Sequence, residues 1–222
     1  MKKNRKKRTI IVLSVLLLIA AAGYGYLFLG SKITDANPEI IKGDAGTNAV
    51  IVYFTRSGVI TAEGNVDAVS SASMNIHDGV TKEAALQLQR ITGADLFEIR
   101  TERHYRNAFL GTAATAWIEE ALDTRPKLAA QPENLDAYDV IYVGFPIWWF
   151  NAPMAVGSFL ESYDLSGKTV VPFCTSQDNG IDICMDYIRE VSGGATVLDG
   201  FRFRSASDED VIRWLDGTGL YE

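Results

Sequence analysis

The sequence has few of the residues that usually build metal or thiol sites. Of its 222 residues, two are cysteine and two are histidine. His77 and His104 have no carboxylate or cysteine neighbours at the spacing of metal ligands, so no metal site is expected. Cys174 and Cys184 are too far apart in the sequence for a C-x-x-C pair. They are predicted to be two buried thiols or, outside the cytoplasm, a disulfide.

Several motifs of catalysis and nucleotide binding are also missing. The loop after the first predicted strand lacks G-x-G-x-x-G, which argues against a dinucleotide fold. There is no G-x-S-x-G, which argues against a serine hydrolase on this kind of sheet. The tetrapeptide SGKT (166–169) resembles half of a P-loop, but Ser162 stands where the first glycine is required. It also precedes its strand, so we interpret it as a turn.

Charge is unevenly distributed along the chain. Six of the 21 basic residues lie within residues 1–8, and no Asp or Glu precedes Asp35. The rest of the chain carries 15 basic and 28 acidic residues, a balance of about −13. A surface this acidic repels nucleic acid and favours a partner protein that is basic at its contact surface.

Residues 9–30 contain no charged side chain. As a helix they would span about 33 Å, the thickness of the hydrocarbon core of a bilayer. The sequence therefore predicts a single-pass cell-membrane anchor at 9–30, with the basic tail (1–8) in the cytoplasm and the rest outside. The alternative is a signal peptide cleaved near Ala20–Ala22, followed by secretion. Residues 31–48 mix Pro, Gly, Asp and Asn without periodicity and are predicted to be a linker.

Strands and helices alternate after residue 48. Apolar, β-branched runs predict the strands, and helical spacing with turn residues predicts the helices. The predicted strands are 49–54, 95–100, 138–145, 168–175 and 196–203, and the predicted helices are 81–92, 113–122, 154–163, 181–191 and 208–215. This order predicts a doubly wound α/β domain over 49–222, with a parallel sheet whose ligands bind at the carboxyl ends of the strands.

Hydroxyl and glycine residues follow the first predicted strand. The loop TRSG (55–58) carries Thr55, Ser57 and Gly58, and Thr81 opens the following helix. A helix start also has free backbone N–H groups and a favourable dipole. This combination binds a phosphate without needing lysine.

Aromatic residues crowd the loop after the third predicted strand, GFPIWWFNAP (144–153). Packing in the core accounts for one tryptophan more easily than for two. We expect Trp148 or Trp149 to lie flat on a conjugated ring held about one nucleotide length from the phosphate. The loop after the fourth strand would then offer backbone N–H groups and the hydroxyls of Thr175 and Ser176 to the polar edge of that ring.

The chain from Ala49 to the C-terminus resembles the flavodoxin family, in particular members whose first loop carries an insertion. The family's phosphate loop, T/S-x-T/S-G-N-T, is split here into TRSG and DGVT (78–81). Further segments that resemble the family are RPKL (125–128), YDVIYVGFPIWW (138–149), SGKTVVPFCT (166–175) and VIRWLDG (211–217). The resemblance implies a flavodoxin-like five-stranded parallel sheet of order 2-1-3-4-5, FMN held without a covalent bond, and electron transfer.

Two departures from the family pattern bear on FMN binding. Val80 stands where the family's loop usually has Asn, which removes one hydrogen bond near the phosphate. The loop after the fourth strand has no Tyr, which leaves the outer face of the flavin open to solvent or a substrate. Arg56 is interpreted as a solvated loop charge, with a phosphate contact as the alternative. The implied FMN-binding residues are Thr55, Arg56, Ser57, Gly58, Gly79, Val80, Thr81, Pro146, Ile147, Trp148, Trp149, Phe150, Thr175, Ser176 and Gly180.

Three functions are compatible with these features. The first is an FMN-binding protein that mediates electron transfer with a redox partner protein at the membrane surface. The second is an FMN-dependent NAD(P)H or quinone-type reductase, favoured by the uncovered flavin face and the long insertion at 101–132. The third is a flavodoxin-shaped interaction domain without a cofactor, which Val80 and the missing Tyr would suit.

Overall fold

The computed structural model describes residues 13–23, 25, 38–44, 46–56, 79–106 and 108–220. Ser57 and Gly58, two of the predicted site residues, lie outside these ranges, and so does the predicted insertion at 59–77. The described residues include all five predicted strands and the five predicted helices of the domain.

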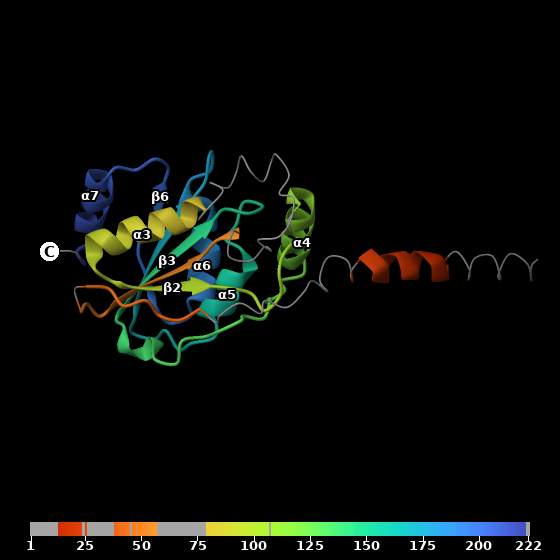
Figure 1. Cartoon of the computed structure of the whole chain (residues 1–222), viewed down its shortest axis with the longest axis horizontal. Coiled ribbons are helices and arrows are strands. Elements are labelled where there is room, and N and C mark those ends of the chain that lie inside the picture. The colour runs from red at the N-terminus through yellow and green to blue at the C-terminus, as the bar shows by residue number, and fades with distance from the viewer. Residues whose placement is uncertain are drawn as a thin grey trace, which may run out of the picture.

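One parallel sheet forms the centre of the domain (Figure 1). Its strands run in the order β2-β1-β3-β4-β5, and β6 also pairs with β4. This confirms the predicted order 2-1-3-4-5. The strands are β1 (Ala49–Phe54), β2 (Asp95–Ile99), β3 (Val140–Pro146), β4 (Thr169–Thr175), β5 (Thr196–Val197) and β6 (Phe201–Phe203).

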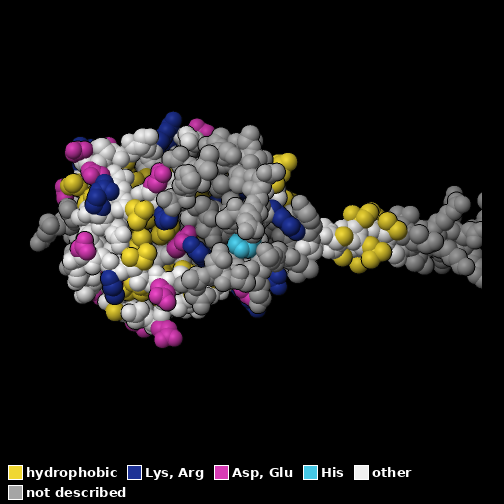
Figure 2. Space-filling model, viewed as in Figure 1, with side chains coloured by type: hydrophobic (Ala, Val, Ile, Leu, Met, Phe, Trp, Pro, Cys, Tyr) yellow, Lys and Arg dark blue, Asp and Glu magenta, His cyan; other side chains and the backbone are white. Residues whose placement is uncertain are grey.

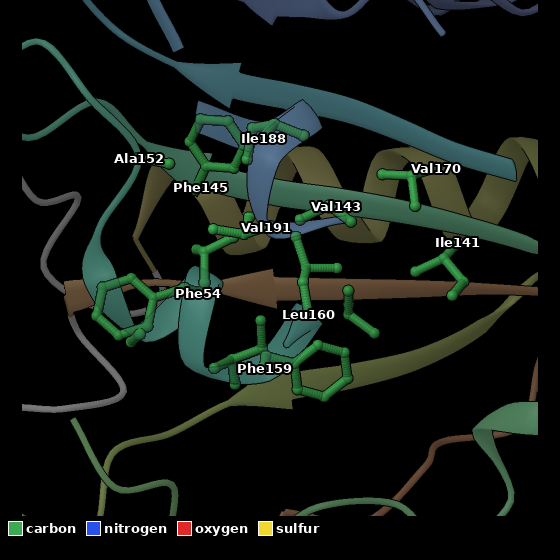
Figure 3. Packing of buried hydrophobic residues seen from close by; sticks show 14 of the residues in the cluster. Phe54, Ile141, Val143, Phe145, Ala152, Phe159, Leu160, Val170, Ile188 and Val191 are labelled. Carbon is green, nitrogen blue, oxygen red and sulfur yellow. The ribbon is translucent and has the colours of Figure 1, made fainter. Parts of the chain in front are cut away.

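Helices cover both faces of the sheet. Alternate residues of β1 point to opposite faces, with Val50 and Val52 in one hydrophobic cluster and Ile51 in the other. The first cluster includes buried residues of α5 and α6 (Figure 3), and the second includes those of α3 and α7. The helices are α3 (Val80–Thr92), α4 (Phe109–Ala121), α5 (Met154–Leu160), α6 (Met185–Val191) and α7 (Asp208–Thr218).

The predicted fifth strand, 196–203, is divided into β5 and β6. The N–H of Leu198 donates to the carbonyl of Val170 over 3.0 Å. The next donor in a parallel ladder would be the N–H of residue 172, which is a proline and has none. The ladder therefore breaks there and resumes where Phe201 pairs with Phe173.

Part of the predicted linker lies along the free edge of β2. The N–H and carbonyl of Ile41 each bond with Leu96 over 2.8 Å, in antiparallel register. At Gly43 a Cβ would lie 2.0 Å from the carbonyl oxygen of Gly93, so the close approach requires glycine. We call residues 41–43 the strap.

Asp95 fastens the strap to the sheet. Its carboxylate accepts hydrogen bonds from Lys42 Nζ at 2.6 Å, from the Tyr138 hydroxyl at 2.5 Å and from the Gly43 N–H at 2.7 Å. Burial acts to raise the pKa of Asp95, but these hydrogen bonds together hold it below its ordinary value. The strap is therefore fixed by charge-assisted bonds as well as by backbone pairing.

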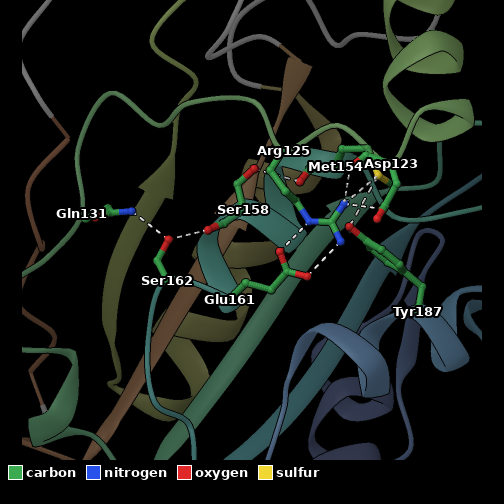
Figure 4. Close-up of polar contacts among 8 residues, drawn as sticks. All are labelled: Asp123, Arg125, Gln131, Met154, Ser158, Glu161, Ser162 and Tyr187. Carbon is green, nitrogen blue, oxygen red and sulfur yellow. Dashed lines mark hydrogen bonds and ion pairs between the residues drawn. The ribbon is translucent and has the colours of Figure 1, made fainter.

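Arg125 joins the end of the α4 region to α5 and α6 (Figure 4). Its guanidinium forms a bidentate pair with Glu161, at 2.5 and 2.8 Å, and a third bond to the Asp123 carboxylate at 2.5 Å. The guanidinium carbon also lies 5.8 Å from the centre of the Tyr187 ring. These contacts hold the C-terminal part of the segment 101–132 against the rest of the domain.

A separate helix covers residues 13–23, and its apolar side chains are exposed (Figure 2). Among the residues that the structure describes, no helix has the length and hydropathy needed to span a bilayer. The predicted membrane span at 9–30 is therefore not confirmed. Residues 9–12, 24 and 26–30 of that span lie outside the described ranges.

Candidate functional site

The carboxyl ends of β1, β3 and β4 meet at one edge of the sheet, which we call the rim. Thr81 lies in the first turn of α3 and Thr175 ends β4, and their hydroxyl oxygens lie 2.7 Å apart in a buried contact. The N–H of Ile147, which follows β3, donates to the carbonyl of Thr175 over 3.2 Å. The start of α3, the loop after β3 and the end of β4 are therefore brought together.

Helix α3 begins at the rim without a side-chain cap. Gly79 occupies the N-cap position with φ of 76°, a backbone conformation that favours glycine, and makes no side-chain capping bond. Val80, the first helical residue, is 43% exposed. The first N–H groups of a helix have no partner within it, and its dipole is positive at this end. This end of α3 is therefore suited to hold an anion.

Thr55 and Arg56, which follow β1, are both buried. Arg56 Nε donates to the hydroxyl of Thr112 on α4 over 3.2 Å, and that hydroxyl donates to the carbonyl of Arg106 over 2.6 Å. The interpretation of Arg56 as a solvated loop charge is wrong, because α4 packs over it. Its contact with a phosphate stays a prediction.

Residues 148–151 form a tight two-residue turn at the end of β3. Trp148 and Asn151 exchange two backbone hydrogen bonds of 2.9 Å each. The two central residues, Trp149 and Phe150, have φ of 48° and 66°. Positive φ at both central positions defines a type I′ turn, which normally takes Asn or Gly there. Two aromatic residues in this conformation store strain, which is typical of functional sites.

The two adjacent tryptophans have different surroundings. Trp148 is half-buried and packs edge-on against Phe54 and Tyr105, with ring centres 5.3 and 5.5 Å away. Trp149 is 46% exposed, and its Nε1 donates to the carbonyl of Ala113 on α4 over 2.7 Å. Phe150 is 67% exposed. Trp149 is therefore the indole with a face available to a planar ligand, while Trp148 belongs to the core.

The loop after β4 contributes polar backbone to the rim. Ser176 Oγ accepts a hydrogen bond from the N–H of Asn179 over 3.1 Å, which folds the loop back on itself. Arg202 of β6 donates to the carbonyl of Asp178 over 3.1 Å. Gly180 then caps the 3₁₀ turn η3 (Ile181–Cys184) without a side-chain bond. The loop is therefore held against β6 beside Thr175.

A buried acid–phenol pair lies behind the rim. The hydroxyl of Tyr105 donates to Glu119 of α4 over 2.7 Å, and both side chains are buried. Burial raises the pKa of Glu119 to about 7, against the opposing effect of this hydrogen bond. Glu119 also lines a cavity of about 250 Å³ with His104, Lys127 and other residues of the segment 101–127.

Sequence reasoning missed this pair, although a signal was present. The buried face of α4 is made of Thr112, Thr115, Ala116 and Glu119. These residues follow helical spacing, so the pattern places an acid on the face that packs against the domain. Tyr105 gave no such signal, because the segment before α4 has no periodicity.

Most of the predicted site residues lie at the rim, but they do not all face the same way. The described residues that the fold brings to the rim are Thr55, Arg56, Gly79, Val80, Thr81, Pro146, Ile147, Trp148, Trp149, Phe150, Thr175, Ser176 and Gly180. Ile147 and Trp148 pack against the first hydrophobic cluster. Four others are buried: Thr55, Arg56, Thr81 and Thr175. Roles in binding stay predictions for the whole set.

The two cysteines are free thiols in the core. Cys174 lies on β4 and Cys184 at the end of η3. Burial raises the pKa of each thiol to about 12. Of the two predicted alternatives, the structure therefore shows buried thiols and not a disulfide.

A family model described as flavodoxin matches residues 68–218, more than half of the chain. A solved protein from Bacteroides eggerthii DSM 20697, provisionally named a flavoprotein, is 26% identical with a TM-score of 0.63. The match covers 77% of this chain and 97% of that one. A protein with the same provisional name from Bacteroides uniformis ATCC 8492 is 28% identical with a TM-score of 0.62, over 77% and 99% of the two chains.

A third solved structure, a flavoprotein in complex with FMN from Lactobacillus acidophilus NCFM, shares the fold. It is 18% identical with a TM-score of 0.55, and the match covers 75% of this chain and 97% of that one. No curated protein matches the sequence.

Proposed function

The chain belongs to the flavodoxin family, and from this premise we propose that it binds FMN and transfers electrons at a membrane surface. The observation that carries the proposal is the 2.7 Å contact between the hydroxyls of Thr81 and Thr175. It places the start of α3, which suits a phosphate, and the loops that suit a planar ring at the same edge of the sheet. The family and the similar fold that contains FMN support this choice of cofactor.

The donors at the rim fit the phosphate of FMN. The N–H groups of Val80 and Thr81 belong to the uncapped first turn of α3. Of the two bonded hydroxyls of Thr81 and Thr175, one donates to the other, and the acceptor keeps its own proton to donate. We propose that these groups and Thr55 hold the phosphate, and that Ser57 and Gly58 complete the loop.

The exposed indole fits the ring of FMN. Trp149 is held by its bond to Ala113, so its orientation is fixed before a ligand arrives. Pro146, Ile147 and Phe150 flank it, and Ser176 and Gly180 offer polar groups to the edge of the ring. When bound, FMN supplies the redox chemistry, and the protein supplies binding, orientation and electrostatic tuning.

The sequence supports a place at the membrane. Residues 9–30 carry no charge, and six basic residues precede them. We propose that this segment anchors the chain in the cell membrane with the domain outside the cytoplasm. Secretion after cleavage near Ala20–Ala22 is the alternative. The acidic balance of the rest of the chain favours a redox partner that is basic at its contact surface.

A second candidate function is reduction of a small acceptor such as a quinone with NAD(P)H. The observation that favours it is the loop 176–180, which has no aromatic side chain to cover the outer face of a bound ring. Steady-state turnover with NAD(P)H and a quinone, in the absence of a partner protein, would select this function over electron transfer between proteins.

The visible spectrum of the purified full-length chain tests FMN binding. We expect flavin absorption bands and the release of about one FMN per chain on denaturation. The matched variant Thr81→Val, which removes one hydroxyl from the rim, should retain less flavin than the isosteric surface control Thr196→Val. A chain that stays colourless after incubation with FMN would instead establish a cofactor-free interaction domain.

A further inference from the structure

Apolar side chains gather on the outer surface beside the rim. Leu110 and Trp117 on α4 are 78% and 55% exposed, and Trp149 and Phe150 at the adjacent turn are 46% and 67% exposed. The turn is joined to α4 by the bond from Trp149 Nε1 to Ala113. We call these four residues, Leu110, Trp117, Trp149 and Phe150, the rim patch. Exposed apolar patches of this kind mark surfaces that contact a partner or a membrane.

The rim patch carries almost no charge of its own. Helix α4 has no acidic residue in its first turn and no basic residue in its last turn. Its two acids are Glu119, which is buried, and Glu120, which is partly buried. A surface that combines Trp and Phe with aliphatic side chains and carries little charge is suited to the interface between lipid and water.

The strap determines where the N-terminal segment leaves the domain. Ile41 pairs with Leu96, the second residue of β2, in antiparallel register. The chain before Ile41 therefore runs toward the carboxyl end of β2. Helix α4 is the next element after β2 in the sequence, and it lies at the end of the domain toward which β2 points (Figure 1).

The strap also shortens the tether between the domain and the proposed anchor. Only ten residues separate Gly30 from Ile41, the strap residue that pairs with β2, and a fully extended chain over that stretch reaches at most about 40 Å. Without the strap the tether would run to Ala49, and its reach would be roughly 68 Å. The rim is therefore the part of the domain that is held closest to the end of the segment 9–30.

From the exit of the chain, the short tether and the patch composition, we propose that the rim patch contacts the bilayer surface in which residues 9–30 are anchored. This inference rests on the anchoring in the proposed function. The rim then faces the lipid, and a redox partner reaches it along the membrane surface. The excess of acidic over basic residues opposes contact with anionic lipid. The apolar side chains of the rim patch, and not charged ones, therefore make the contact with the bilayer.

Quenching of tryptophan fluorescence by brominated lipid tests this contact. The full-length chain, saturated with FMN, is reconstituted into uncharged phosphatidylcholine vesicles with plain or brominated acyl chains. We expect the brominated lipid to lower the tryptophan emission, because Trp117 lies in the patch and is 55% exposed. Leu110→Glu should reduce this quenching at least twofold.

Two matched controls use the opposite end of the domain. Ile212 on α7 is 36% exposed, and Ile212→Glu should leave the quenching unchanged. Trp214, which stacks on Phe201 with ring centres 5.0 Å apart, should not contribute to the quenched emission, so Trp214→Phe should leave the quenched amount unchanged.

The outcomes separate the contact from the anchoring. If the chain sediments with the vesicles but its emission is the same in both lipids, the contact is refuted and the anchoring stands. If the chain stays in the supernatant, the anchoring fails and the inference fails with it. If Leu110→Glu alters self-association of the detergent-solubilised chain and not the quenching, the patch joins two copies and the inference is wrong.

Discussion

The inner and outer sides of the rim meet at two adjacent residues, Trp148 and Trp149, but their surroundings differ. On the inner side, Phe54, Tyr105 and Trp148 pack edge-on around one another, and Tyr105 bonds to the buried Glu119. On the outer side, Trp149 and Phe150 sit at positive φ, largely exposed, with one side-chain bond from the Trp149 indole to α4. The peptide bond between Trp148 and Trp149 is the boundary.

This difference separates two kinds of contribution to the protein. Buried aromatic contacts lower the free energy of the folded state, whereas exposed aromatics in a strained turn raise it. Strain of that kind is maintained where the geometry serves binding. Changes on the inner side should therefore alter stability, and changes on the outer side should alter ligand affinity.

The largest expected effect is the pH dependence that Glu119 gives to stability. Its pKa is raised from 4.5 in the unfolded chain to about 7 in the folded one, so the folded state binds more protons between these values. The free energy of unfolding should therefore fall as pH rises from about 4 to about 8, by on the order of 3 kcal/mol from this group. Urea denaturation across this pH range measures it.

Glu119→Gln provides the control for that prediction. The amide cannot ionise, and its oxygen can still accept the bond from Tyr105. The variant should lose most of the pH dependence and be more stable than the parent at pH 8. Equal pH profiles for the two chains would show that the pKa of Glu119 is the same in the folded and the unfolded chain.

Trp148→Ala should have the next largest effect. Removing a half-buried indole from between Phe54 and Tyr105 leaves a cavity, so we expect the free energy of unfolding to fall by about 2–3 kcal/mol, near the lower end for large aromatics. Denaturant titration measures the loss. The division between the two sides of the rim would be wrong if Trp149→Ala were as destabilising.

Trp149→Ala should instead weaken FMN binding. Loss of the stacking surface should raise the dissociation constant about tenfold, or about 1.4 kcal/mol, with little change in stability. Titration of FMN fluorescence gives the constant. Trp149→Phe keeps a flat ring and should recover most of the affinity; a loss equal to that of Ala would mean that the indole N–H, and not its face, is what matters.

Phe150→Gly should have the smallest effect, and the opposite sign. Glycine adopts φ of 66° without strain, so the variant should be more stable by up to about 1 kcal/mol. Thermal unfolding measures the gain. A decrease in stability would show that the exposed ring makes contacts that outweigh the strain of the turn.

Local patterns predicted most of the fold. The apolar runs at 49–54 and 169–175 are strands almost to the residue, and Gly93 ends α3 as expected. The division of the fifth strand depends on Pro172, which lies in the neighbouring strand, so the run at 196–203 does not contain that information. The strap was missed for the same reason, because its partner Asp95 lies far along the chain.

The candidate site was predicted in composition but not in orientation. Residue types placed Trp148 and Trp149 together at the rim, but only the turn at 148–151 shows which of them faces outward. Arg56 looks like a solvated charge in TRSG, and its burial depends on α4, more than fifty residues later. Tertiary contacts, and not local propensity, decide both cases.

The central claim is that the start of α3 holds a phosphate while Trp149 holds the attached ring. The most direct test compares the affinities of the purified chain for FMN and for riboflavin, which has the same ring and no phosphate. We predict that FMN binds at least about a hundredfold more tightly. Equal affinities for the two would contradict the account, because the start of α3 would then contribute nothing to binding.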